Sequence, residues 1–371
     1  MAQTEFSFKA QMWKRLKKNK GAMFGLIIII LAVFVSIFGY VIAPDNSPNA
    51  DLQTVEIQAK KPGYTQKFLK IYTGGNKNTG WISNAIYGKT QNYQLVPITG
   101  NPADNSTADS IIINKYIDDD TSVRQAYALH FLVQNHSAET TPEFFVTKKY
   151  WLGTDKFGRD ILSRIIIGTR VSLAVGLIAV LISLTLGILL GALAGYFRGW
   201  VDEVIMWLVN VTWSIPTLLL VFAITMAMGK GFWQIFIAVG LTMWVSVARL
   251  IRGQVMAIKE MEYVQAARSL GLKNSRIILR HILPNILGPV MVIAASNFAT
   301  AIIVEAGLSF LGIGIQPPQP SWGLMIKENY NFIITHNPLL ALIPGFAIML
   351  LVLAFNLLGN GLRDAVDVKQ G

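Results

Sequence analysis

Six long stretches of this sequence contain no Asp, Glu, Lys or Arg, and no other feature limits the possible folds as strongly. A helix that crosses a bilayer needs about 20 mostly apolar residues, and all six stretches are long enough. Hydrocarbon offers the backbone no hydrogen-bond partner, so such segments fold as helices. The alternating pattern of a membrane barrel is absent. We therefore expect an all-α polytopic membrane protein with six transmembrane helices, within residues 21–44, 171–197, 204–229, 231–248, 282–304 and 337–362.

The distribution of charge predicts the orientation of these helices. Residues 1–20 hold six Lys/Arg and one acid, residues 249–284 hold seven and two, and residues 45–160 hold twelve of each. Basic loops beside spanning helices face the cytoplasm, whereas long domains translocate regardless of charge. We expect cytoplasmic N- and C-termini and a cytoplasmic 249–284 segment. The net charge of +11 thus reflects topology, and the expected surroundings are membrane lipid and not nucleic acid.

The first apolar stretch could instead be a signal peptide, because a Lys-rich segment precedes it. Its apolar run is longer than the roughly 7–15 residues of a signal peptide, and no clear Ala-x-Ala cleavage site follows. A first transmembrane helix is the better interpretation. The chain has no cysteine, which excludes a disulfide framework and a thiolate metal site.

Residues 45–150 are polar and too long for a simple connection. Short alternating or β-branched runs are separated by turn-rich stretches, which is typical of strands. We expect a small β-rich extracytoplasmic insertion between the first two helices, and the alternative is a partly disordered insertion. The expected strands cover residues 67–72, 93–98, 110–117 and 126–133.

Residues 151–170, which follow the insertion, contain both apolar and charged side chains. Ile161, Leu162, Ile165 and Ile166 share one helix face, while other positions are polar. Such a segment can lie at the membrane interface, and we expect an external helix that orients the core or lines its entrance. The alternative is a charged flank of the next helix, whose side chains reach back to water. The candidate polar residues are Asp155, Arg159, Asp160 and Arg164.

Small residues and a proline mark the membrane core. Gly187, Gly191 and Gly195 recur every four residues, a spacing that permits close helix packing in lipid. Pro216 frees a backbone carbonyl in the third helix and predicts a kink there. The core covers residues 171–362, between a tail with the first helix at 1–44 and a C-terminal tail at 363–371.

The basic segment 249–284 predicts a helical hairpin between the fourth and fifth membrane helices. Apolar residues recur at helical spacing between Gln254 and Leu270, and Gly271 suits a left-handed C-cap. A second helix is expected from Asn274 to Leu283, where Pro284 would end it. A loop that folds in this way has a soluble partner to dock against.

The residues of this hairpin match a known pattern. Gln265-Ala266-Ala267, Gly271 and Leu283-Pro284 resemble the cytoplasmic loop of binding-protein-dependent ABC importer permeases, in which a Glu-Ala-Ala triplet precedes a Gly and an Ile-x-Leu-Pro end. Two positions depart from that pattern, because Gln265 replaces the Glu and His281 occupies the Ile position.

Three further motifs are similar to the dipeptide/oligopeptide branch of that family, specifically to its C-type subunit. They lie at 152–173, at 305–312 and at 317–323. The resemblance covers residues 150–362 closely and 1–44 loosely, while the usual members have a shorter connection where this chain has residues 45–150.

The resemblance implies a six-helix permease of the type I importer fold in a bacterial inner membrane. A second, related permease subunit would complete the pathway, and an extracytoplasmic binding protein would deliver peptide. Two cytoplasmic ATPase subunits would bind ATP and Mg²⁺ and grip one coupling helix in each permease. This chain itself would bind no cofactor and catalyse no reaction. The residues expected to couple to the ATPase are Gln265, Ala266, Ala267, Gly271, Leu283 and Pro284.

Candidates for a gate or pathway lie near the external ends of the last helices. Glu305 is an acid at the edge of an apolar helix, and ionisable residues at membrane depth are often functional. The alternative is a structural hydrogen bond to a neighbouring loop or helix end. Pro317 and Trp322 lie in a proline-rich stretch that would form a rigid external loop, with a plain connector as the alternative.

Other classes of function find less support in the sequence. The chain has no Gly-x-x-x-x-Gly-Lys-Ser/Thr phosphate loop, and its four histidines lack metal-ligand spacing. A receptor would need a signalling domain, yet about nine residues follow the last helix. An intramembrane enzyme would need paired catalytic groups, and only Glu305 is available. Peptides, nickel chelates and other small solutes all remain open as cargo. The acidic run Asp118–Asp120 is interpreted as a solvated loop.

Overall fold

The computed structural model describes residues 8–73, 80–100, 110–128, 144–229, 231–334 and 337–366. The chain divides into two compact units. The first, here the helical unit, comprises Met1–Val33, Val171–Gln316 and Phe346–Gly371, and the second, here the mixed unit, comprises Phe34–Arg170 and Pro317–Gly345. Three long helices contribute part of their length to each unit.

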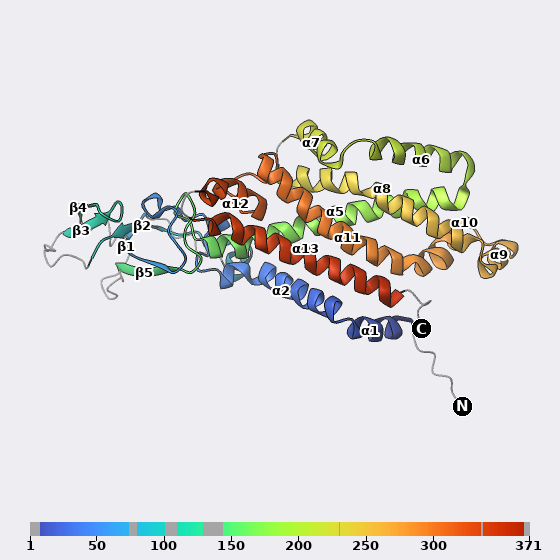
Figure 1. The fold of residues 1–371 in the computed structure, drawn as a ribbon, viewed down its shortest axis with the longest axis horizontal. Helices are drawn as coiled ribbons and strands as arrows, with labels where there is room; N and C mark the ends of the chain where they lie inside the picture. The colour runs from blue at the N-terminus through green and yellow to red at the C-terminus, as the bar shows by residue number, and fades with distance from the viewer. Residues whose placement is uncertain are drawn as a thin grey trace, which may run out of the picture. The chain divides into compact units, whose positions relative to one another are not determined.

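Long apolar helices dominate the described chain, as predicted (Figure 1). Five of them are long and apolar enough to cross a membrane by themselves: α2 (Lys20–Ile42), α5 (Ile161–Phe197), α8 (Phe232–Lys259), α11 (Leu287–Leu311) with the helical turns before it, and α13 (Leu339–Val366). A short helix, α1 (Phe8–Lys18), precedes them. The remaining apolar window forms two helices, α6 (Gly199–Trp213) and α7 (Thr217–Met228), which are bent by 94° at Pro216.

Contacts within the helical unit indicate that the bent pair returns the chain along the unit as one candidate span. The ends of α5 and α8 lie together, because the Lys259 ammonium donates a hydrogen bond to the Tyr196 carbonyl at 2.7 Å. Their beginnings lie together as well, since Val175 packs in one cluster with Phe236. The two helices are therefore parallel, and α6 and α7 must lead the chain back along the whole unit between them. With the bent pair counted as one, the described residues contain six candidate membrane spans.

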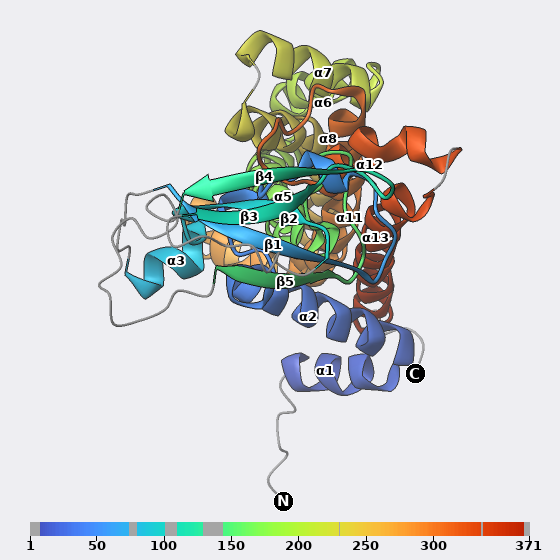
Figure 2. The same ribbon diagram turned by 90° about the vertical axis from the view of Figure 1, so that its left-hand side faces the viewer.

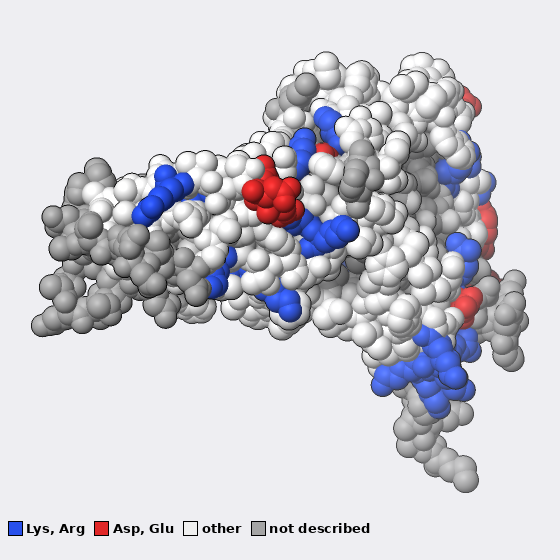
Figure 3. Space-filling model, turned by 60° about the vertical axis from the view of Figure 1, so that its left-hand side comes forward, with Lys and Arg blue, Asp and Glu red and all other residues white. Residues whose placement is uncertain are grey.

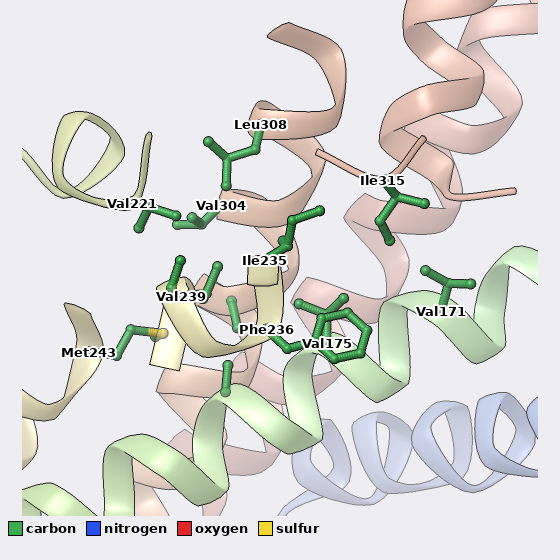
Figure 4. Packing of buried hydrophobic residues seen from close by; sticks show 13 residues of the cluster. Val171, Val175, Val221, Ile235, Phe236, Val239, Met243, Val304, Leu308 and Ile315 are labelled. Atoms are coloured by element: carbon green, nitrogen blue, oxygen red, sulfur yellow. The ribbon is translucent and has the colours of Figure 1, made fainter. Parts of the chain in front are cut away.

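Four helices, α5, α7, α8 and α11, contribute side chains to the buried cluster where α5 and α8 begin (Figure 4). Val171 and Val175 come from α5, Phe236 from α8 and Leu308 from α11, and α7 contributes Val221. Side chains without polar atoms fill this space, so the cluster is packing and not a polar channel.

The glycines at every fourth position of α5 allow it to approach α8 closely, as the sequence predicted. A Cβ atom built at Gly191 would lie 2.5 Å from the Ala248 carbonyl oxygen, and one at Gly195 would lie 2.7 Å from that of Arg252. Real side chains do not come so close to a backbone, so only glycine fits here.

The helix α1, the end of α13 and the 249–284 segment lie at one end of the helical unit (Figure 1). Asn19 donates to the Asp364 carboxylate at 3.2 Å, and Leu16 and Ala22 pack against Ala365. An even number of crossings agrees with this arrangement. Figure 3 shows that Lys and Arg side chains gather over α1 at the same end.

The insertion folds as a five-stranded antiparallel sheet in the mixed unit (Figure 2). The strand order is β4-β3-β2-β1-β5, so neighbours in sequence pair except where β5 returns to β1. Two clusters, around Leu69 and around Phe68, bury apolar side chains of successive residues of β1. The strands are β1 (Tyr64–Tyr72), β2 (Tyr93–Ile98), β3 (Ser110–Tyr116), β4 (Ser122–Ala128) and β5 (Phe145–Tyr150), and α3 (Trp81–Tyr87) lies between β1 and β2.

The β-rich prediction for the insertion is confirmed, with corrections in detail. The strand expected at 126–133 lies at 122–128 in the structure, and its remainder falls outside the described residues. The strand β5 was not expected, because its sequence FVTKKY carries too little alternation. Short 3₁₀ turns at Pro48–Ala50 and Val55–Ile57 precede the sheet.

The separate external helix expected within 151–170 does not form. Instead α5 begins at Ile161 and continues without a break to Phe197. Asp160 starts it, since its side chain accepts a hydrogen bond from the Ser163 amide at 2.9 Å. An N-cap of this kind fixes where a helix begins but does nothing to end it. Nothing in 161–170 breaks the helix before the apolar stretch continues it.

Candidate functional site

The 249–284 segment is a series of helical pieces and not the two-helix hairpin that we expected. α8 continues to Lys259, and the chain becomes extended at Met261 before α9 (Glu262–Ser269) begins. After Gly271 come α10 (Asn274–Ile277), a π-helical turn (Ile278–Ile282) and a 3₁₀ turn (Leu283–Ile286).

The predicted stop at Pro284 is wrong in the structure. Pro284 falls in the first turn of the 3₁₀ segment, which leads directly into α11. The backbone N–H groups of a first helical turn have no partner within the helix. Proline is tolerated there because it has no N–H to leave unpaired. The π turn before it absorbs the change in hydrogen bonding.

The predicted cap at Gly271 is confirmed. Its φ is +76°, and its amide donates to the Arg268 carbonyl at 3.0 Å. The next amide, of Leu272, donates to the Ala267 carbonyl at 3.3 Å. These two bonds form a Schellman motif, which requires a left-handed residue and usually a hydrophobic contact across the turn. Ala267 and Leu272 supply that contact within one buried cluster.

The small residues of α9 divide between a buried and an exposed face. Val264 and Ala267 point into a core formed with Val255, Ile277 and other side chains. Ala266 and Gln265 are exposed, as are Gly271 and Pro284, while Leu283 is half-buried. The structure therefore brings the six expected coupling residues to one short stretch of surface and underlying core.

Large apolar side chains are exposed along this segment although it is polar overall. Leu270 is 82% exposed, and Met261, Tyr263 and Leu279 are also exposed. Sequence reasoning passed over these residues, because isolated apolar residues on a helix are usually assigned to the core. Several exposed apolar side chains on one polar segment are typical of a protein interaction surface.

A polar pocket of about 320 Å³ opens beside α9. It holds the cations Lys259 and Arg268 and the acid Glu260, which pairs with Arg198 at 3.1 Å. The lining residues are Tyr196, Lys259, Glu260, Val264, Gln265, Arg268 and Ser269.

The structure supplies a reason for the amide at position 265. The Gln265 amide nitrogen donates to the Glu260 carbonyl at 3.1 Å, just after the last turn of α8. A carboxylate could not donate this bond, and it would also face the negative end of the α8 dipole.

The external polar residues form a buried ion cluster in the mixed unit and not a solvent-facing helix side. Arg159 and Arg164 are almost fully buried, and they share the carboxylates of Asp155, Asp51 and Glu328. Arg159 lies 2.6 Å from Asp155, 2.7 Å from Glu328 and 3.2 Å from Asp51. Burial works against the charge of Arg159, but the carboxylates of Asp155 and Glu328 raise its pKa above the ordinary value.

Asp160 belongs to a second buried network, at the start of α5. It accepts from the Ser163 amide and hydroxyl, and the Ser163 hydroxyl accepts from the Asp45 amide at 2.8 Å. Burial raises the pKa of the Asp160 carboxyl, although the hydrogen bonds from Ser163 act in the opposite direction. Asp45 and Asp160 thereby join the chain after α2 to the first turn of α5.

Trp322 is held in place by α5. Its indole nitrogen donates to the Ile165 carbonyl at 3.1 Å, and a Cβ atom at Gly168 would come within 3.0 Å of the ring. Trp322 begins α12 (Trp322–Asn329), whose last turn positions Glu328 for the ion cluster. Pro317, by contrast, is exposed.

Glu305 is fully buried near the end of α11 in the helical unit. It accepts a hydrogen bond from the Ser309 hydroxyl at 2.6 Å, and that hydroxyl accepts from the Ile315 amide at 3.0 Å. This chain of bonds ties the end of α11 to the turn after it, which is the structural alternative we considered.

The described residues contain no cluster of His, Asp and Glu able to hold a metal ion. Within the acidic run 118–120, Asp119 pairs with Lys60 at 2.5 Å and accepts from the Tyr116 hydroxyl at 2.6 Å. His281 is half-buried, and the other three histidines, at 130, 136 and 336, lie outside the described residues.

Comparison with known proteins identifies matching families at both ends of the chain. Residues 187–370 match the binding-protein-dependent transport system inner membrane component, and residues 7–58 match the N-terminal transmembrane domain of oligopeptide transport permease C. Residues 59–186, which include the sheet, lie outside both matches.

Individual proteins are similar over most of their own length. The dipeptide transport system permease protein DppC of Alkalihalophilus pseudofirmus is 43% identical over 242 residues, which cover 64% of this chain and 79% of that protein. The glutathione transport system permease protein GsiD of Pectobacterium atrosepticum is 44% identical, covering 59% of this chain and 73% of that protein.

Among solved structures, the MetNI methionine ABC transporter in an inward-facing conformation is 18% identical, with a TM-score of 0.46. The match covers 55% of this chain and 96% of the chain in the MetNI structure.

Proposed function

Since this chain belongs to the family of inner membrane permease subunits of binding-protein-dependent ABC importers, we propose that it moves small peptides across a bacterial membrane. The relatives that support this cargo are named as a dipeptide and a glutathione permease, and both cargoes are short peptides. Both of these relatives are permeases, which gives no support to the receptor alternative. A second, related permease subunit completes the pathway, and an extracytoplasmic binding protein delivers the peptide.

The 249–284 segment couples this subunit to a cytoplasmic ATPase. The observation that carries this assignment is the exposure of four apolar side chains on either side of Gly271 in the sequence, namely Met261, Tyr263, Leu270 and Leu279. Leu270 offers the partner a large apolar anchor, and the small Ala266 leaves room for close approach. ATP and Mg²⁺ bind to the ATPase subunits, and this chain performs no chemistry.

Rigid attachment allows such a surface to transmit force. The core below α9 joins it to α8, α10 and α11 through Val255, Ile277 and Val290. A displacement of α9 therefore moves the ends of two membrane helices. Alternating access requires a two-state element of this kind, whose balance the nucleotide changes.

The pocket beside α9 points to the charge of the ATPase group that docks there. Gln265 brings no negative charge, and Lys259 and Arg268 line the pocket with a single acid, Glu260. A group of opposite sign fits best, so the ATPase presents an acidic side chain to this pocket. If position 265 held a Glu, a cationic side chain of the ATPase would fit the pocket better than an acidic one.

The test uses the whole transporter, reconstituted in liposomes with its ATPases and binding protein. Leu270→Glu changes a side chain that projects into solvent, so the subunit still folds and inserts. We expect loss of ATP-dependent uptake of a radiolabelled dipeptide and loss of ATPase co-purification. Val123→Glu on the exposed strand β4 is the matched control. Normal uptake by the Leu270 variant rules out the coupling assignment.

A second pair of variants tests the turn itself. Gly271→Pro forces φ from +76° to about −65° and removes the amide that bonds Arg268. We expect uptake to be lost while the subunit stays in the membrane, as measured by immunoblot of the membrane fraction. Gly253→Ala, at an exposed position of α8 with no atom near its Cβ, is expected to transport normally.

A further inference from the structure

The helix α3 in the insertion presents an unusual surface. None of its residues is buried, and four of its seven are large apolar side chains. Trp81 is 80% exposed and Tyr87 is 70% exposed, and Ile82 and Ile86 are also largely exposed. A soluble domain rarely leaves such a group of side chains in water. The sheet clusters around Phe68 and Leu69 include none of them.

Contacts within the mixed unit attach α3 to the ends of two membrane helices. The Arg170 guanidinium of α5 donates to the Ile86 carbonyl at 2.8 Å and lies 5.0 Å from the Tyr40 ring of α2. Just after α3, the Lys89 amide donates to the Asn46 carbonyl at 2.8 Å. A Cβ atom at Gly88 would lie 2.9 Å from the same Tyr40 ring.

These anchor points mark the boundary between polar and apolar surroundings. Arg170 is the last charged residue before the apolar stretch 171–197, and Tyr40 lies two residues before the end of α2 at Ile42. Tyrosine and arginine at such positions reach the headgroup region of a bilayer. These contacts hold α3 beside residues of the kind expected at a membrane surface.

From this position and composition we propose that α3 is an interfacial helix, which lies on the lipid surface and inserts its apolar side chains. Ile82 and Ile86 are four residues apart and share one helix face, suited to the upper acyl region. Trp81 and Tyr87 flank them with rings that favour the headgroup level. The polar Ser83 and Asn84 lie between them in sequence. This contact holds the insertion against the membrane.

A protein partner would also cover these side chains, but the structure favours lipid. The residue after α3, Gly88, packs against Tyr40 near the end of α2, and the same helix end exposes Ile37, Val41 and Ile42. That surface of a membrane helix faces lipid unless another subunit covers it. The experiment is therefore designed to separate the two coverings.

The absence of native cysteine makes site-directed spin labelling direct. Single cysteines replace Ile82 and Ile86 in the full chain, and the complete transporter is reconstituted in phosphatidylcholine and phosphatidylglycerol liposomes. Accessibility of each label to oxygen, which concentrates in lipid, is compared with accessibility to a water-soluble nickel complex. Val123→Cys on β4 serves as the control in water.

For a lipid-inserted helix, the labels at 82 and 86 lose access to the nickel complex and keep access to oxygen, while the label at 123 does the reverse. Nickel access at 82 and 86 equal to that at 123 overturns the proposal. Protection from both reagents, together with an immobilised spectrum, indicates a protein covering and overturns it as well. Peptide uptake by each labelled transporter verifies that the fold is intact.

Discussion

At the scale of single residues, Gln265 shows how one substitution fits its surroundings. Its amide donates to the Glu260 carbonyl, where a Glu would place a carboxylate beside a carbonyl oxygen and a helix C-terminus. We predict that Gln265→Glu lowers stability by about 1 kcal/mol and weakens ATPase binding. Gln265→Ala, which loses the bond without adding charge, should be intermediate. Thermal unfolding and co-purification of the ATPase measure both effects, and a Glu variant that binds better than the native subunit contradicts this account.

The buried ion cluster makes a second prediction at this scale. Glu328→Gln keeps a side-chain oxygen but removes its charge, so the remaining ion pairs of Arg164 are the longer ones to Asp155 and Asp51, at 3.8 and 3.9 Å. A buried charge that loses its partner costs about 3–5 kcal/mol. We expect a large fall in the thermal unfolding temperature. Glu56→Gln breaks a partly exposed pair with Lys115 and should cost at most about 1 kcal/mol. Equal losses in the two variants contradict the assigned role.

The raised pKa of Asp160 predicts how stability depends on pH. A carboxyl whose pKa is higher in the folded state stabilises the protein below its ordinary pKa, and this contribution is lost as pH rises through the folded value. Asp160→Asn keeps a capping oxygen but cannot ionise. The native stability relative to this variant should therefore decline with rising pH, by up to about 1.4 kcal/mol per pH unit in the affected range.

Unfolding temperatures measured between pH 4 and 8 test this slope. Asp120→Asn, in an exposed turn, controls for the removal of one negative charge. A native protein that gains stability over the Asp160 variant as the pH rises has the opposite sign and refutes the assignment.

At the scale of elements, glycine spacing on α5 gives a matched comparison. Alanine is favoured over glycine in a helix by about 1 kcal/mol, so Gly253→Ala should stabilise α8 slightly. Gly191→Ala should destabilise the protein, because the new methyl would meet the Ala248 carbonyl of the neighbouring helix. Opposite shifts of the unfolding temperature are expected for the two substitutions. A gain at both sites shows that α5 and α8 can separate without cost.

The same scale shows what could be predicted from the sequence. The apolar windows predicted the helices, and Gly271 predicted its own cap, because both signals are local. Pro216 predicted a kink, but the 94° bend depends on how α6 and α7 pack against α8.

Contacts between residues that are far apart in sequence could not be predicted from local patterns. Arg159 was predicted only as a polar residue of an external segment, and its burial could not be predicted because its partner Glu328 is 169 positions away in sequence. The exposure of Leu270 and of the other apolar side chains near Gly271 could not be predicted, because exposure is a property of the folded chain. In contrast, the β-branched runs of the insertion predicted three of its strands closely.

At the scale of the whole molecule, six crossings would place α1, the end of α13 and the 249–284 segment on one side of the membrane. The basic charge of residues 1–20 and 249–284 predicts that this side faces the cytoplasm, and the sheet would then be extracytoplasmic. We predict that Ser122→Cys, exposed on β4, reacts with an impermeant maleimide in intact cells. Ser269→Cys, exposed at the end of α9, should react only after the membrane is permeabilised.

Because the native chain has no cysteine, it does not react with the maleimide and serves as the unlabelled control. If α6 and α7 re-entered instead of crossing, an odd number of crossings would put Lys18 and Ser269 on opposite sides. Lys18→Cys, exposed on α1, therefore completes the experiment. Matching behaviour at 18 and 269 supports six crossings, and opposite behaviour refutes them. Labelling of positions 18 and 269 in intact cells, with position 122 protected, would show that the protein has the opposite orientation. The Gly271 turn would then be out of reach of a cytoplasmic ATPase.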